Sequence, residues 1–388
     1  LANLLKLKPK IIIVAAHPLT INTFLREITR RLSKWAEIYV LINFDQNDFI
    51  HSDVKENAKL ISVPIQRKIS LLKDLWAFFI LLKEIFLIKP NCIISATPKA
   101  GFLTQLSSFL LMIQTRLHIF TGQVWVNKKR ILRYILKNID TLTGKFTTMN
   151  LVDGSAQQKF LINEKVLNYR KSRVTGYGSV SGVDLNKFRF SIKHRNELRS
   201  KYNLQDNDLV IIYLGRIDKD KGISDLVEAF EKFILPKNKN SHLFIVGYPE
   251  SSSLISSLMQ SKEILGRHLQ LIGPTLNPEK YLSFADIFCL PSYREGLNVT
   301  LLEAAACELS CVSTDIYGTH DALIDEISGL KYKPKDIEQL ASQINRIIKD
   351  KKLTAKLKAN ALERVKKYFD SKIVSELFDK FIFDLLKK

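Results

Sequence analysis

Two glutamates stand eight residues apart in the stretch LPSYREGLNVTLLEAAACE, residues 290–308. Glu295 lies in a segment that Gly296 allows to turn sharply and to approach a ligand closely. A carboxylate in such a loop can accept hydrogen bonds from sugar hydroxyls and can balance positive charge in a transition state. Because no ordinary structural role explains a loop carboxylate at this place, Glu295 is the first candidate for chemistry.

The second glutamate, Glu303, leaves two interpretations open. Thr300-Leu-Leu-Glu303 fits the capping box, in which the glutamate only bonds the backbone of the cap residue. If the helix instead begins near Asn298, Glu303 lies about 7 Å along it, at roughly 1.5 Å per residue. That separation would suit one carboxylate at a transferred sugar and one at the ribose of a nucleotide.

Cations cluster in the segment YLGRIDKDKG, residues 213–222. Gly215 ends an expected strand, Arg216 follows it, and Lys221 precedes an expected helix. Two fixed cations beside free helix N–H groups suit a diphosphate, although a charged loop of this kind is also compatible with simple solvation. Similar free N–H groups are expected where the later helix begins, at Leu297, Asn298 and Val299.

Strand and helix patterns that alternate along the chain must position these residues. Continuous apolar runs such as KIIIVAA, residues 10–16, predict buried parallel strands, and the pattern restarts at DLVIIYLGRI, residues 208–217. We therefore expect two doubly wound α/β domains facing a cleft, with ligands beyond the carboxyl ends of the strands. The predicted divisions are a first domain over 1–180, a second domain over 181–365, and a helix over 366–388.

The charge of the 388-residue chain is +20, and it is uneven. Residues 1–184 hold 27 basic and 12 acidic side chains, whereas residues 185–388 hold 32 and 27. A basic first half indicates an anionic partner: a phospholipid surface, a phosphorylated substrate or nucleic acid. No RNA-binding, zinc-finger or basic-helix signature is present, so no nucleic-acid partner is expected. The four cysteines lack metal-site spacing, which predicts reduced thiols and no metal.

The most apolar segment is ISLLKDLWAFFILLKEIFLIKP, residues 69–90. Its longest uncharged run, residues 75–82, is too short for a span of about 20 apolar residues. A helix with its charges on one side fits better, either packed in a core or lying in a membrane interface. Residues 1–14 lack a signal-peptide cleavage site and run directly into a strand, so no secretory signal is expected.

Four motifs together resemble the retaining glycosyltransferases of family 4, which have the GT-B fold. They are the Glu295/Glu303 pair, GRIDKDKG, the segment GSVSGVDLNKF and the loop ATPKAGFL, which is similar to one in members that build bacterial surface polysaccharides. The motifs span residues 95–303 in the order and spacing of that family.

The resemblance implies that the first domain binds the acceptor, that the second domain binds the nucleotide sugar, and that the last helix packs back on the first domain. It also implies roles for residues on the donor side. Arg216 and Lys221, after Gly215, would bind the donor diphosphate, and Glu303 the ribose. Glu295, with the amides from Gly296 to Val299, would position the transferred sugar, so Glu295, Lys221 and Arg216 are the catalytic candidates. The family needs no metal or other cofactor and transfers sugar with retention, usually explained by front-face attack in which the leaving phosphate takes the acceptor's proton.

The resemblance also implies a UDP-hexose or UDP-N-acetylhexosamine donor and a polyprenyl-diphosphate-linked acceptor at the cytoplasmic face of the membrane, in capsule, O-antigen or related glycan synthesis. The first domain departs from the family pattern, since AAHPLTINTF replaces the common Gly-Gly loop. His17, Thr20 and Gln123 are the acceptor-side candidates. The open alternatives are an epimerase or phosphorylase of the same fold, an inverting transferase, and a basic membrane- or nucleic-acid-binding protein.

Overall fold

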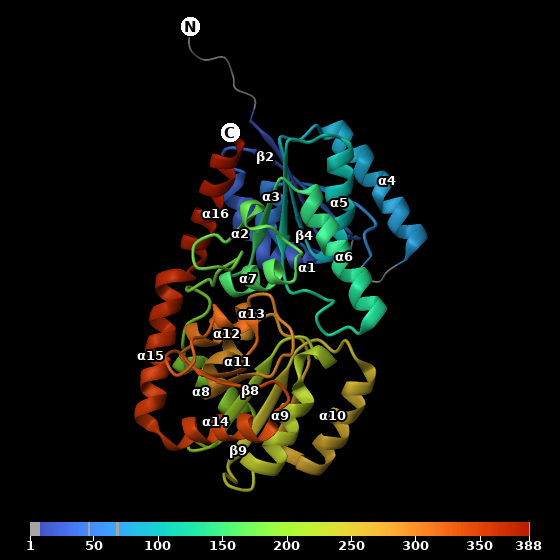
Figure 1. Cartoon of the computed structure of the whole chain (residues 1–388). Helices are drawn as coiled ribbons and strands as arrows, with labels where there is room; N and C mark the ends of the chain where they lie inside the picture. The colour runs from blue at the N-terminus through green and yellow to red at the C-terminus, as the bar shows by residue number, and fades with distance from the viewer. Residues whose placement is uncertain (1–7, 46, 67–69, 388) are drawn as a thin grey trace. The chain divides into compact units, whose positions relative to one another are not determined.

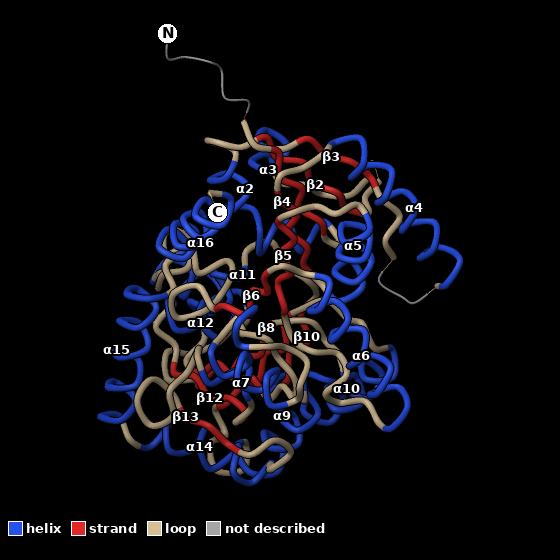
Figure 2. Tube along the Cα trace, turned by 45° about the horizontal axis from the view of Figure 1, so that its top comes forward, coloured by secondary structure: helices blue, strands red, loops and turns tan. Residues whose placement is uncertain are grey.

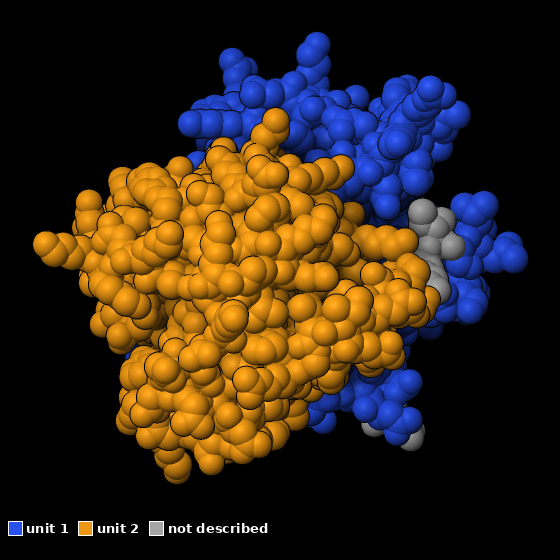
Figure 3. Space-filling model, turned by 90° about the horizontal axis from the view of Figure 1, so that it is seen from below, with its two compact units in different colours: residues 1–182, 371–388 blue, residues 183–370 orange. Residues whose placement is uncertain are grey.

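The computed structural model describes residues 8–45, 47–66 and 70–387, so the predictions for residues 1–7 and Ile69 lie outside the described residues. The chain divides into two compact units, coloured separately in Figure 3. Unit 1 holds the chain up to Gly182 and again from Ser371, and unit 2 is Val183–Asp370.

Unit 1 contains one parallel sheet in the order β3-β2-β1-β4-β5-β6-β7. Its strands are β1 (Lys10–Val14), β2 (Glu37–Ile42), β3 (Lys59–Ser62), β4 (Cys92–Ala96), β5 (Thr115–Phe120), β6 (Met149–Val152) and β7 (Ser172–Arg173). In β1, Ile11 and Ile13 enter one core while Ile12 and Val14 enter the other. Burial on both faces explains why this strand is a continuous apolar run.

Helices cover both faces of this sheet (Figures 1 and 2). The core of Ile11 and Ile13 is shared with α2 (Arg26–Leu32), α3 (Ser52–Asn57) and α16 (Ser371–Leu386). The core of Ile12 and Val14 is shared with α4 (Leu71–Ile88) and α5 (Pro98–Leu110). The remaining elements are α1 (Pro18–Thr20), a π-helical turn (Ile21–Leu25), α6 (Arg130–Phe146), α7 (Ser155–Asn163) and a 3₁₀ turn (Tyr169–Lys171).

Unit 2 repeats the architecture with six parallel strands in the order β10-β9-β8-β11-β12-β13. The strands are β8 (Leu209–Leu214), β9 (Ser241–Val246), β10 (Leu269–Ile272), β11 (Ile287–Leu290), β12 (Ser310–Thr314) and β13 (Leu330–Tyr332). The α-helices are α8 (Ile192–Lys201), α9 (Ile223–Ala229), α10 (Ser252–Leu265), α11 (Pro278–Phe284), α12 (Val299–Ala306), α13 (Tyr317–His320), α14 (Ile337–Lys349) and α15 (Lys351–Tyr368). The predicted pair of doubly wound α/β domains is thus confirmed.

The chain enters and leaves unit 2 at one place. The Val183 N–H donates to the Phe369 carbonyl at 2.7 Å, and Val183 forms a parallel bridge with Asp370. The units therefore divide after Gly182 and after Asp370, whereas the sequence placed the divisions after residues 180 and 365. The later division falls at 370 because α15 continues to Tyr368 and contacts α12 within unit 2.

The last helix returns to unit 1, as predicted. α16 packs on α2, and the Trp35 indole N–H donates to Asp379 at 2.8 Å. All four cysteines are buried and unbonded, in agreement with the expected free thiols. Among the described residues, no helix is long and apolar enough to span a membrane.

Candidate active site

The predicted donor-side residues follow two neighbouring strands of unit 2. β8 pairs with β11 in the middle of the sheet, although strands β9 and β10 lie between them in the chain. Because parallel strands end at the same edge, the loops after β8 and β11 lie together there. This is the point where strand order reverses, which is where open α/β sheets bind ligands.

Gly222 lets these two loops touch. It has φ +62°, in the left-handed region, and it caps both a 3₁₀ turn (Lys219–Lys221) and α9. A Cβ on Gly222 would lie 2.0 Å from the Pro291 carbonyl oxygen, so only glycine fits there. The Tyr293 N–H also donates to the Asp220 carbonyl at 2.9 Å. The backbones of the two loops are therefore in direct contact.

Lys221 and Glu295 form a buried ion pair across this contact. The Lys221 Nζ lies 2.6 Å from Glu295 Oε1, and their side chains are 12% and 10% exposed. Burial acts to raise the pKa of the Glu295 carboxyl, but the charge and hydrogen bond of Lys221, with smaller contributions from Ser292 and Asn298, hold this pKa below its usual value. An ammonium group has three N–H donors, so Lys221 can bind Glu295 and a further anion together.

Arg216 stands at the end of β8 with a carboxylate partner of its own. Its guanidinium pairs with Glu250, and its side chain is about a third exposed. The Tyr213 hydroxyl donates to the Arg216 carbonyl at 2.7 Å, which fixes the backbone directly after β8, where Gly215 lies. Arg216 is therefore placed at the same edge as Lys221, and a diphosphate there would compete with Glu250 for it.

The N-terminus of α12 excludes the interpretation in which Glu303 completes a capping box with Thr300. The helix begins at Val299, and its cap is Asn298, whose side chain accepts from the Leu301 N–H at 2.8 Å. Thr300 is thus inside the helix, so the capping box with Thr300 as the cap is wrong. Gly296, Asn298 and Val299 are partly exposed beside this cap, and Leu297 is buried in the core.

Glu303 lies among other charges of unit 2. Burial, together with the nearby Glu279 carboxylate, raises the pKa of Glu303 to about 7, against the opposing charge of Lys187. Lys187 itself lies 3.7 Å from Glu279. Glu303 is therefore a proton-binding group near neutrality, connected to the GVDLNKF segment through Lys187.

The acceptor-side candidates all lie in unit 1. The exposed His17 caps α1, its Nδ1 accepting from the Leu19 N–H at 3.1 Å, and the Thr20 N–H donates to the His17 carbonyl. Both follow β1, at the carboxyl edge of the sheet. Gln123 is 1% exposed, donates to the Thr121 carbonyl and accepts from Gln157 at 3.1 Å. Its amide holds a buried network, a structural role that the acceptor-side prediction did not include.

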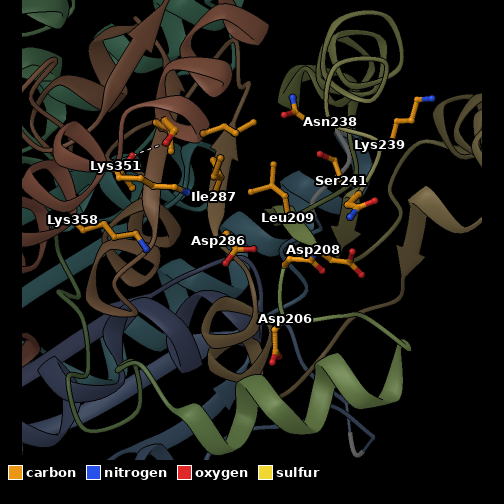
Figure 4. A pocket seen from close by; sticks show the side chains of 15 residues that line it. Asp206, Asp208, Leu209, Asn238, Lys239, Ser241, Asp286, Ile287, Lys351 and Lys358 are labelled. Carbon is orange, nitrogen blue, oxygen red and sulfur yellow. Dashed lines mark hydrogen bonds between the residues drawn. The ribbon is translucent and has the colours of Figure 1, made fainter.

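A pocket of about 610 Å³ in unit 2 lies at the opposite edge of the sheet (Figure 4). It is lined by the first residues of β8, β9 and β11, namely Leu209, Ser241 and Ile287, and by charged side chains such as Asp286 and Lys358. Because Lys221 and Glu295 follow the carboxyl ends of these strands, this pocket is separate from their site. In the part of the chain that the structure describes, no group of three or more His, Cys, Asp or Glu is arranged to hold a metal.

Comparison with known proteins identifies a domain in unit 2. Residues 194–364, which include the whole Lys221–Glu295 site, match the family model described as Glycosyl transferases group 1. The chain is a glycosyltransferase with a group 1 domain. It is 28% identical over 330 residues to the capsular polysaccharide biosynthesis glycosyltransferase CapM of Staphylococcus aureus, covering 84% of this chain and 85% of CapM.

Two further proteins are similar to this glycosyltransferase. The UDP-Gal:alpha-D-GlcNAc-diphosphoundecaprenol alpha-1,3-galactosyltransferase of Escherichia coli is 27% identical over 291 residues, 74% of each chain. The crystal structure of Anabaena HepE in complex with UDP and glucose matches with a TM-score of 0.80 at 16% identity, covering 96% of this chain and 99% of HepE. CapM is named for capsular polysaccharide biosynthesis, and the fold of this chain is GT-B, as the motifs implied.

Several contacts of the site could not be found from the sequence. Arg294 pairs with Asp220 at 3.2 Å, and the Tyr293 hydroxyl donates to Asp225 at 2.7 Å. These residues are separated by about 70 positions and lie in a charged loop and a helix that resemble ordinary surface. The only local signal was Gly222, because a glycine beside a cation cluster indicates close backbone approach.

The raised pKa of Glu303 should make the unfolding free energy of the glycosyltransferase depend on pH. A raised carboxyl pKa means that the folded state binds the proton more tightly, so the unfolding free energy falls as pH rises from about 4.5 to about 7. We expect Glu303→Gln to remove this loss and to raise the unfolding free energy at pH 8 by about 2 kcal/mol, after allowance for its partly exposed position. At pH 4 the two proteins should be equally stable.

Urea unfolding at pH 4, 6 and 8 measures this difference. Glu263→Gln, on the exposed side of α10, is the matched control and should show the same stability as wild type at all three values. A Glu303→Gln difference that does not grow with pH would mean that folding does not raise the pKa of Glu303.

Proposed function

We propose that this glycosyltransferase transfers a hexose or N-acetylhexosamine from a UDP-sugar, with retention, to a polyprenyl-diphosphate-linked saccharide in bacterial surface-glycan synthesis. The observation that carries the proposal is the buried Lys221–Glu295 pair at the switch point of unit 2. It offers a fixed cation for the donor diphosphate and, directly beside it, a carboxylate for sugar hydroxyls.

The proposed chemistry needs only groups that the chain and its substrates supply. The bond from the sugar C1 to the diphosphate oxygen breaks, and a bond from C1 to the acceptor oxygen forms on the same face. The acceptor's proton goes to the leaving phosphate. Lys221 and Arg216 would stabilise the negative charge that grows on that phosphate, which is the largest expected catalytic effect.

Glu295 has two proposed roles in this reaction. It orients the Lys221 ammonium group, and its carboxylate would position the transferred sugar. Glu303 would bind the ribose, so Glu303→Gln should raise the KM for the donor while it stabilises the fold. A diphosphate, ribose and hexose held by side chains and backbone amides require no metal ion.

The names of relatives support the substrate classes. The similar E. coli enzyme is named for a UDP-sugar donor and a diphosphoundecaprenol acceptor. We extend both classes to this chain and place its acceptor at the cytoplasmic membrane face. CapM is named for capsular polysaccharide, which supports a surface glycan as the product.

Thermal unfolding with nucleotide sugars, followed by a transfer assay, tests the proposal. At a hundredfold excess over Kd, a UDP-sugar should raise the Tm by roughly 5 °C, because it binds only the folded state. UMP, which lacks the diphosphate, is the control and should raise it less. With a polyprenyl-diphosphate-linked N-acetylhexosamine, UDP should be released together with product whose anomeric configuration matches that of the donor. An inverted product, or a response to GDP-sugars alone, would contradict the proposal.

A further inference from the structure

α6 is amphipathic, but its apolar face points outward. Ile131, Leu132, Ile135 and Leu142 are 74%, 46%, 48% and 39% exposed. The buried side of the helix carries Asp140, Thr143 and Gly144. A surface helix normally turns its apolar stripe toward the core. The reversed orientation of α6 therefore indicates that its outer face has a partner.

Beneath α6, charged side chains as well as the apolar Leu136 contact the core around Trp125. Arg133 and Lys137 lie over the ring of the buried Trp125, at 5.1 and 5.7 Å from its centre, and both pair with Glu164. The Trp125 N–H donates to Asp140 at 2.8 Å. These interactions hold α6 in its orientation, so the outward apolar face is not the result of a loosely attached helix.

α4 also turns an apolar face outward. Only one stripe, Ala77, Leu81, Ile85 and Ile88, enters the core. The opposite face exposes large apolar side chains, each at least 54% exposed: Leu71, Leu72, Leu75, Trp76, Phe79, Phe86 and Leu87. Both sequence interpretations of this segment thus apply to different sides of one helix: one side is core, and the other is a candidate interface.

The two helices begin at the same edge of unit 1. Lys99, in the first turn of α5, pairs with Asp74 of α4 at 2.7 Å, and Phe109, near the end of α5, contacts the ring of Phe146 at the end of α6. The three helices are therefore parallel neighbours, as Figures 1 and 2 also show. Because α4 and α6 have 18 and 17 residues and α5 has 13, their first turns extend past α5 at the carboxyl edge of the sheet.

Unpaired cations surround these apolar faces. Lys73 and Lys83 are exposed on α4, and Lys128, Lys129 and Arg130 are exposed at the start of α6. None of the five forms an ion pair within the described part of the chain. Trp76 and Tyr134, 63% and 71% exposed, are of the types that prefer a membrane interface. A second copy of the chain would bring like charges together, whereas anionic lipid would neutralise them.

We propose that the outward faces of α4 and α6 form a docking surface for an anionic lipid bilayer. The helices would lie in the headgroup region without crossing it. Docking would bring the carboxyl edge of the unit 1 sheet, where His17 and Thr20 follow β1, close to the lipid. The docking itself does not depend on the proposed function. Only its purpose rests on that function, because a polyprenyl-linked acceptor is held in the bilayer.

Sedimentation of the full chain with vesicles tests the docking surface. Vesicles with about one third phosphatidylglycerol should bind the protein at least tenfold more strongly than pure phosphatidylcholine vesicles, and 0.5 M salt should remove most of the difference. Trp76→Ser with Phe79→Ser, and Ile131→Ser with Ile135→Ser, should each weaken binding to the anionic vesicles at least tenfold. Lys129→Glu with Arg130→Glu should weaken it similarly.

Met259→Ser with Ile264→Ser is the matched control, since these α10 side chains of unit 2 are 50% and 75% exposed. It should leave vesicle binding within twofold of wild type, and all variants should keep the wild-type Tm because the replaced side chains are exposed. Equal binding to neutral vesicles, or an equal loss in the control, would overturn the proposal. So would a dimer, found without vesicles, that the α4 and α6 substitutions dissociate.

Turnover with a short-chain, water-soluble acceptor separates this proposal from the proposed function. The α4 and α6 variants should keep wild-type turnover with that acceptor and lose it only with acceptor embedded in vesicles. Wild-type protein that binds vesicles but transfers no sugar would contradict the proposed function and leave the docking surface standing. Variants that lose turnover equally with both acceptors would overturn the role assigned to docking.

Discussion

Lys221→Ala is expected to lower kcat at least a hundredfold, because removing one group that stabilises developing charge typically costs 10²–10³ in rate. The loss should appear in kcat more than in donor KM, since the charge on the leaving phosphate grows toward the transition state. Steady-state release of UDP in the presence of acceptor measures both constants. Lys219→Ala is the control: this lysine is two residues away in the same turn but is exposed.

The same substitution should reverse the pH dependence that Glu295 gives to stability. In wild type the Glu295 pKa is lowered, so the pair stabilises the fold above about pH 4.5, and the contribution is lost as pH falls through the lowered pKa. Without Lys221, burial is the largest single influence on this pKa and is opposed only by the weaker contributions of Ser292 and Asn298. We therefore expect the pKa to rise and the unfolding free energy to fall as pH rises. At pH 7 the variant should be less stable by about 3 kcal/mol.

Urea unfolding between pH 4 and pH 8 measures this reversal. The gap between wild type and Lys221→Ala should widen as pH rises, while Lys219→Ala should follow wild type throughout. A turnover within a few-fold of wild type would contradict the phosphate role of Lys221. A stability gap that is constant with pH would contradict the ion pair.

Gly222→Ala is expected to separate the two loops of the site. The new Cβ would lie 2.0 Å from the Pro291 carbonyl, and the left-handed backbone alone costs roughly 1–2 kcal/mol for a residue with a Cβ. Since the carbonyl belongs to the backbone, the loop after β11 must move and carry Glu295 away from Lys221. We expect turnover to fall at least a hundredfold, because misplacement by about 1 Å has effects of that size.

Gly266→Ala is a closely matched control for this change. Gly266 also has a positive φ, +54°, although its ψ of −125° differs from the 22° of Gly222, and no atom lies within 4 Å of the position its Cβ would take. It should lose stability through backbone strain alone and keep wild-type turnover. Equal turnover in the two variants would show that contact between the loops is not needed for the reaction.

The fold could be predicted because its signals are local. Continuous apolar runs such as Ile11–Val14 are typical of strands buried on both faces, and their alternation with helical segments indicates parallel sheets. The division after Asp370 could not be found this way. α15 and α16 have similar helical patterns, and only their packing, on α12 and on α2, assigns them to different units.

The site was predicted in its residue types but not in its pairings. The sequence predicted that Lys221 and Glu295 lie at one edge of a sheet, but not that they form an ion pair or that Arg216 pairs with Glu250. Of the two interpretations of Glu303, the one with Thr300 as the helix cap is wrong, whereas a helix that begins near Asn298 agrees with the structure. Side-chain pairings across loops depend on angstrom-scale placement, which residue spacing does not encode.

The bridge between Val183 and Asp370 also bears on the order in which the protein acquires its structure during synthesis. Unit 2 is one uninterrupted stretch whose two ends meet, so all of its strands are present once residue 370 has been made. Unit 1 must wait, because Phe378 and Ile382 complete the core that α2 and α3 share. The basic half, which carries the exposed apolar faces, is therefore synthesised first but completes its packing last.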